Sequence, residues 1–189
     1  DVDLASEFRY RRPILAPGTL VVIISQSGET ADSLAALREA HRHGNKVLGI
    51  VNVVGSSIAR EADYVFYTMA GPEIAVATTK AFSTQLTAGF LWAVHLGHVR
   101  GQLSDEQTEA LLRSLMALPD QIARLLEEKE RIQWFASKYA SAQDTFFIGR
   151  GLDYAISMEG SLKLKEISYI HSEAYAAGEL KHGTISLIE

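Results

Sequence analysis

A short apolar run followed at once by a polar loop is the feature that most constrains the fold. Residues 19–24, TLVVII, are apolar and largely β-branched, which is typical of a parallel strand covered on both faces. The loop SQSGET follows. Residues 30–43 then place their apolar side chains on one helical face, with Gly44 as a stop signal. This order predicts a buried strand that leads through a polar loop into a helix.

Two more apolar runs continue this rhythm. Residues 46–51, KVLGIV, and residues 64–68, YVFYT, predict further strands, with a turn and a short helix between them. Strands that alternate with helices are typical of an α/β fold with a doubly wound parallel sheet flanked by helices. No G-x-G-x-x-G sequence follows the first strand, which disfavours a Rossmann domain.

The rest of the chain is mostly helical until a second strand begins. We predict a buried core helix over 78–98 and a mostly helical stretch over 105–140, where Pro119 kinks the helix or starts a new one. The heptad-like leucine stripe of this stretch is interpreted as core packing, with a dimer seam as the alternative. Residues 145–149, TFFIG, predict a strand that leads into a helix over 154–170. A last apolar run begins at Ile185.

Composition excludes several classes of protein. A net charge of −5 with scattered basic residues argues against a nucleic-acid partner. The chain has no cysteine, so disulfides and thiolate chemistry are excluded, and a cytoplasmic location is expected. The longest apolar helical stretch is too short to cross a bilayer, and we expect no membrane partner.

The loop after the first strand is the strongest candidate for a binding site. Ser25, Gln26, Ser27 and Thr30 offer hydroxyl and amide groups at a helix N-terminus, where free N–H groups and the helix dipole attract anions. Gly28 allows close approach of a ligand to the backbone. A capping box formed by Ser27 or Thr30 is the competing interpretation. We predict a phosphate site.

A weaker polar cluster opens the next long helix. Val76 and Thr78 stand in the sequence VATTK, and Thr78 is equally well explained as an N-cap residue. The functional alternative is a contact with a sugar.

The segment EGSLKLKE carries the residues best suited to proton transfer. A helical period places Glu159, Lys163 and Glu166 on one face. An exposed salt-bridge ladder would have the same spacing, but a carboxylate beside an ammonium in a cleft can serve as a general base. His182 follows between two glycines in GELKHG, and its near-neutral pKa suits proton transfer.

Together these motifs resemble a known family. SQSGET, VATTKAF and LKLKEISYIHSEAYAAGELKHG are similar to the isomerase half of the glucosamine-6-phosphate synthases, which consists of two sugar-isomerase (SIS) lobes. The resemblance implies residues 1–100 as a first lobe that lacks its first strand. It implies residues 101–144 as a helical connection and residues 145–189 as the start of a second, truncated lobe.

The resemblance also implies roles for the candidate residues. Ser25, Gln26, Ser27 and Thr30 match the family's phosphate loop, and Val76 and Thr78 match its sugar-contacting segment. Glu166 matches the base that moves a proton between C1 and C2, Lys163 its partner, and His182 the residue assigned to ring opening, with Glu159 in support. The implied ligands are fructose 6-phosphate and glucosamine 6-phosphate. The family needs no cofactor, and its histidine reaches the neighbouring subunit of a homodimer.

The chain also departs from the family pattern. Thr78 replaces a usual serine, and Thr184 replaces a usual proline. The glutamine-hydrolysing domain, a first-lobe strand and a C-terminal lysine are absent from this sequence, so we expect a fragment with little or no synthase activity alone. A related SIS deglycase or isomerase, or a sensor that binds phosphosugars without catalysis, would share the loop but would not need the KLKE and ELKHG sequences.

Overall fold

The computed structural model describes residues 1–188. The chain forms two compact units, Asp1–Leu112 and Arg113–Glu189. Among the described residues, no helix combines the length and the apolar character needed to cross a membrane.

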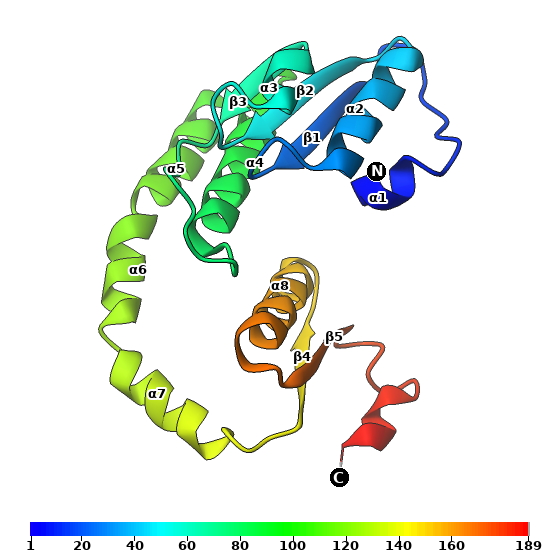
Figure 1. The fold of residues 1–189 in the computed structure, drawn as a ribbon. Coiled ribbons are helices and arrows are strands. Elements are labelled where there is room, and N and C mark those ends of the chain that lie inside the picture. The colour runs from blue at the N-terminus through cyan, green and yellow to red at the C-terminus, as the bar shows by residue number, and fades with distance from the viewer. Residues whose placement is uncertain (189) are drawn as a thin grey trace. The chain divides into compact units, whose positions relative to one another are not determined.

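The first unit is built on a parallel sheet with the strand order β1-β2-β3 (Figure 1). The strands are β1 (Leu20–Ser25), β2 (Lys46–Val51) and β3 (Tyr64–Tyr67). Ser25 is in register with Val51, and Val51 with Tyr67. The three predicted strands are confirmed, and all three end at the same edge of the sheet. The prediction that both faces of the first strand are covered is wrong, because Leu20, Val22 and Ile24 are more than 40% exposed.

Helices pack on both faces of the central strand β2. The helices of this unit are α1 (Ala5–Phe8), α2 (Ala31–Arg42), α3 (Ser57–Glu61) and α4 (Thr79–Val99), with α5 (Asp105–Met116) following. Val47 and Val51 of β2 belong to one buried cluster, which includes residues of α2 and α3. Leu48 and Ile50 belong to another, which includes Ala88 of α4. Successive side chains of a strand point to opposite faces, so β2 is buried on both sides. The predicted doubly wound fold is confirmed.

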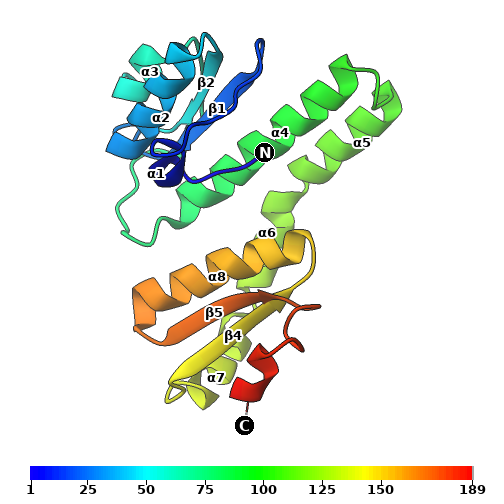
Figure 2. The same cartoon turned by 90° about the vertical axis from the view of Figure 1, so that its right-hand side faces the viewer.

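The second unit contains a smaller parallel pair of strands. Its elements are α6 (Leu118–Leu126), α7 (Lys129–Lys138), β4 (Asp144–Gly149), α8 (Leu152–Ser168), β5 (His171–Ala176) and the 3-10 helix η1 (Thr184–Leu187). Helix α8 connects β4 to β5 and packs on both (Figure 2). A Cβ atom on Gly149 would lie 2.4 Å from backbone atoms of Asp153 and Tyr154, so this tight strand-to-helix turn requires glycine.

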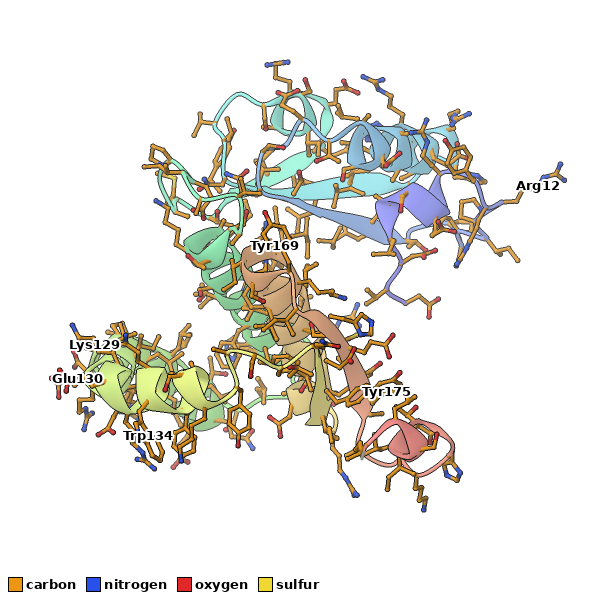
Figure 3. The ribbon with its side chains drawn as sticks, turned by 60° about the horizontal axis from the view of Figure 1, so that its bottom comes forward. Arg12, Lys129, Glu130, Trp134, Tyr169 and Tyr175 are labelled. Carbon is orange, nitrogen blue, oxygen red and sulfur yellow. The ribbon has the colours of Figure 1, made fainter. Side chains whose placement is uncertain are left out.

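The helical stretch 105–140 differs from its prediction in one respect. It consists of three helices, and Pro119 lies in the first turn of α6, which confirms that it starts a new helix. No residue of α5, α6 or α7, all of which are described, is buried. Trp134 of α7 is likewise half exposed (Figure 3). The interpretation of the leucine stripe as core packing is therefore wrong for this chain, because periodicity shows that a face is apolar but not what covers it.

One other element differs from the sequence expectation. Helix α4 is buried on one side only, since Ala88 and Val94 are covered while Leu86 and Leu96 are more than 40% exposed. The last apolar run, which begins at Ile185, lies in η1.

Candidate functional site

The loop after β1 folds onto its own hydroxyl groups. Ser25 is buried at the end of the strand, and its Oγ accepts a hydrogen bond from the Gly28 N–H at 3.1 Å. Ser27 Oγ accepts from the Glu29 N–H at 3.2 Å, and the Ser25 and Thr30 hydroxyls are 3.4 Å apart. The structure thus brings Ser25, Ser27 and Thr30 together beside the start of α2.

Thr30 takes the N-cap position of α2 without capping it. Its backbone is extended, but its side chain makes no capping hydrogen bond. The competing capping-box interpretation is therefore wrong for Thr30, and the Ser27 hydroxyl bonds within the loop instead. A helix of 12 residues with an uncapped first turn offers N–H groups and the positive end of its dipole to an anion.

Gly28 lets this loop lie directly against the start of α3. Its φ of +68° is in the left-handed region, and an added Cβ would lie 2.1 Å from Ser56 Oγ. The Gly28 carbonyl accepts from the Ile58 N–H at 3.0 Å, and the Gln26 carbonyl accepts from the Asn52 N–H at 3.1 Å. The loop is therefore fixed by the chain that follows β2. A glycine is required here for both conformation and space.

Asn52 connects the loop to the segment that leads toward α4. Its Nδ2 donates to the Gly71 carbonyl at 2.8 Å. Its Oδ1 accepts from the Ala70 N–H at 2.8 Å and from Thr68 Oγ1 at 3.2 Å. Our sequence reasoning missed Asn52, although a polar residue directly after a buried strand, at the edge where ligands bind, is a usable signal.

The second predicted cluster precedes α4 in a strained conformation. Val76 is exposed. Thr78 takes the N-cap position of α4 with φ +51° and makes no capping bond. Its Oγ1 donates to the Val76 carbonyl at 3.0 Å. A positive φ is costly for a β-branched residue and is often found at functional sites, which favours the ligand-contact interpretation over simple capping.

The third predicted cluster forms on α8. Lys163 Nζ lies 2.6 Å from Glu166 Oε2 and 3.5 Å from Glu159 Oε1, and each side chain is partly covered. The hydrogen bond to Glu166 is the main cause of a raised Lys163 pKa, with the nearby charges contributing. Lys163 is therefore a cation held between two carboxylates, a pair suited to moving a proton and balancing an oxyanion.

His182 lies apart from this cluster within the same unit. Helix α8 ends at Ser168, next to the start of β5, whereas His182 follows the end of β5 at Ala176. A six-residue strand spans roughly 20 Å, so Glu166 and His182 lie near opposite ends of β5. The structure thus separates His182 from Glu166 of its own chain along β5.

Two negative observations complete the description. Within residues 1–188 no cluster of three or more His, Asp or Glu side chains could hold a metal ion. A cavity of about 380 Å³ in the first unit is mainly apolar, and its lining includes Phe66, Trp92, His95 and His98. None of the predicted site residues lines it.

Comparison with known proteins identifies the family of the chain. The family model described as "SIS domain" matches residues 1–94 and 138–189. Glutamine--fructose-6-phosphate aminotransferases [isomerizing] of Caldanaerobacter subterraneus subsp. tengcongensis and Clostridium tetani are 60% and 59% identical over all 189 residues. The chain spans 31% of the length of each of these curated relatives.

A solved structure shares the whole fold. The C-terminal domain of glucosamine-fructose-6-phosphate aminotransferase from Francisella tularensis matches with a TM-score of 0.97 and 43% identity, over 100% of this chain and 54% of that one. A putative phosphosugar isomerase from Silicibacter pomeroyi DSS-3 matches with a TM-score of 0.72 and 31% identity, over 89% of this chain and 48% of that one. The predicted resemblance is confirmed, and the chain belongs to the SIS domain family.

Proposed function

We propose that this chain is the sugar-phosphate-binding and isomerising region of a glucosamine-6-phosphate synthase. In the proposed reaction, fructose 6-phosphate and ammonia are converted to glucosamine 6-phosphate. The single observation that carries this proposal is the loop from Ser25 to Thr30, with three hydroxyls gathered at an uncapped helix N-terminus. The names of the two curated relatives described above supply the substrate.

The phosphate is the part of the substrate that the first unit would hold. Hydroxyls of Ser25, Ser27 and Thr30 and the amide of Gln26 would donate to phosphate oxygens, and the dipole of α2 would stabilise the negative charge. Val76 and Thr78 would contact the sugar. Binding energy at the phosphate would orient C1 and C2 for the chemistry.

Proton transfer would be carried by the cluster on α8. Ammonia would first condense with the C2 carbonyl to an imine, with loss of water. The Glu166 carboxylate would then take a proton from C1 and return it to C2, while the C1 hydroxyl proton passes to the nitrogen, so that the imine becomes an amine and C1 becomes an aldehyde. Lys163, held 2.6 Å from Glu166, would balance negative charge on oxygen during this shift. Glu159 would keep Lys163 in place. No metal or organic cofactor enters the reaction as proposed.

His182 would act at the site of a second subunit. Its place near the other end of β5 from Glu166 supports ring opening in the neighbouring subunit of a homodimer. We further propose two SIS lobes, residues 1–100 and 145–189, joined by helices over 101–144, in a cytoplasmic enzyme of amino-sugar biosynthesis.

A substitution of Glu166 tests the catalytic assignment. In a full-length synthase that carries this sequence, Glu166→Gln should lower the rate of glucosamine 6-phosphate formation by about 100-fold or more, since it removes a general base. Fructose 6-phosphate binding, measured by calorimetry, should persist. Glu130→Gln, a change on α7 (Figure 3), is the control and should leave the rate unchanged. A Glu166→Gln enzyme with normal turnover would refute the assignment of Glu166 as the catalytic base.

A further inference from the structure

Glu29 is the one acidic side chain of the loop SQSGET, and it is turned toward α3. Its Oε1 accepts a hydrogen bond from the Ser57 N–H, the first residue of α3, at 2.8 Å. The hydrogen bond to Ser57 lowers the pKa of Glu29, and the charge of Arg60 contributes. Glu29 is therefore ionised at neutral pH and bonded to a backbone group.

Neighbouring contacts show that this bond is one of several that hold the loop against the start of α3. The Ile58 N–H donates to the Gly28 carbonyl at 3.0 Å. Ser56 is only 2% exposed. Its Oγ lies 2.1 Å from the position that a Cβ atom on residue 28 would take. This hydroxyl has no hydrogen-bond partner among the described residues. Gly28 and Glu29 thus form hydrogen bonds with consecutive residues of α3. The next residue along the loop is Thr30.

The charge of Glu29 makes its orientation important for an anion site. A carboxylate turned toward a bound phosphate would repel it, because two like charges a few ångströms apart raise each other's energy even at an exposed site. The bond to the Ser57 N–H directs the Glu29 carboxylate to α3. The same bond fixes the backbone that leads into Thr30 and the uncapped first turn of α2, whose N–H groups would face the ligand.

We propose that Glu29 is a positioning residue for the phosphate: it locks the loop in its binding conformation through Ser57 and holds its own charge away from the ligand. This inference rests on the proposed phosphate site. It predicts an effect on substrate affinity rather than on turnover, because Glu29 would touch neither the reacting carbons nor the proton that moves between them.

An ion pair between α3 and α2 provides a matched control. Glu61 accepts two hydrogen bonds from Arg38 of α2, at 2.8 and 2.7 Å. This pair also joins α3 to another element through a carboxylate, but it lies outside the loop. A change at Glu61 should therefore lower the stability of the fold, as a change at Glu29 could, but should leave the affinity for phosphate unchanged.

The experiment compares Glu29→Ala, Glu29→Gln and Glu61→Ala in a full-length synthase that carries this sequence. KM and kcat are measured for fructose 6-phosphate, together with its Kd by calorimetry and the Tm of each variant. Glu29→Ala should raise KM and Kd about tenfold, with kcat little changed. Glu29→Gln keeps an oxygen that accepts from Ser57 and should recover most of the affinity. Glu61→Ala should lower Tm while KM stays at its normal value.

Other results would overturn the proposal. If Glu29→Ala binds fructose 6-phosphate as the unchanged enzyme does, or if Glu61→Ala raises KM equally, Glu29 has no specific role although the phosphate site stands. If the unchanged enzyme does not bind fructose 6-phosphate, the proposed function itself fails. Should Glu29→Ala not fold, Glu29→Asp replaces it. This side chain is one methylene shorter, so KM should still rise, and a normal KM would count against the proposal.

Discussion

At the scale of single residues, the sequence predicted which side chains matter better than how they are held. The hydroxyls of Ser25, Ser27 and Thr30 were predicted from residue type and position, and they do gather in one loop. Their supports at Asn52 and Ser57 were not predicted. Those residues reach the loop through tertiary contacts, which no local pattern in the sequence records.

Asp63 illustrates a residue whose effect depends on pH. Its carboxylate accepts from Lys46 Nζ at 2.5 Å, from the Val47 N–H at 2.9 Å and lies 2.9 Å from His41 Nε2. These bonds hold the pKa of Asp63 well below the usual range, and the bond to Lys46 contributes most. A lowered folded-state pKa stabilises the protein above the unfolded value of about 4, and this stabilisation disappears as pH falls below it.

Asp63→Asn should therefore lower the Tm at pH 7, and the difference from the unchanged protein should shrink below about pH 4. This Tm difference would be measured by thermal unfolding, followed by circular dichroism, between about pH 3 and pH 7. That range includes the ordinary carboxyl pKa of about 4. Asp105→Asn is the control, because that side chain is 98% exposed. A Tm difference that stays constant with pH would show that the lowered pKa does not stabilise the fold.

At the scale of elements, the apolar strands and the helix boundaries were predictable from the sequence. Which faces of those elements are buried was not. The run KVLGIV is a strand buried by helices on both sides, whereas the run TLVVII leaves Leu20, Val22 and Ile24 on an exposed face. Strand β5, HSEAYA, was not predicted, since its polar residues hide the β pattern. Its pairing with β4 comes from the register of two distant segments.

The long helical connection shows the same limit. Its division at Pro119 follows from the chemistry of proline, which has no N–H to donate inside a helix. Its apolar stripe was interpreted as core, yet Leu118, Ile122 and Leu125 are exposed. Amphipathicity is a property of one helix, whereas burial is a property of whatever lies against it. The dimer seam stays a prediction.

At the scale of the whole molecule, the proposal requires two subunits to complete each site. Full-length enzymes with Glu166→Gln or His182→Ala should each be inactive alone. If His182 serves its neighbour, a mixed dimer of the two has one site with both groups intact. A random mixture should then recover about a quarter of normal activity, measured as glucosamine 6-phosphate formed after the subunits are unfolded and refolded together. No recovery would place His182 in its own chain's site.

The central claim is that the loop from Ser25 to Thr30 holds the phosphate of the substrate. The most direct test is calorimetric titration of a full-length synthase carrying this sequence with fructose 6-phosphate, before and after Ser27→Ala combined with Thr30→Ala. Each lost hydrogen bond to a charged group is worth about 1.5–3 kcal/mol, so the double change should weaken binding by about 100-fold or more. Unaltered affinity in a folded double variant would contradict the account.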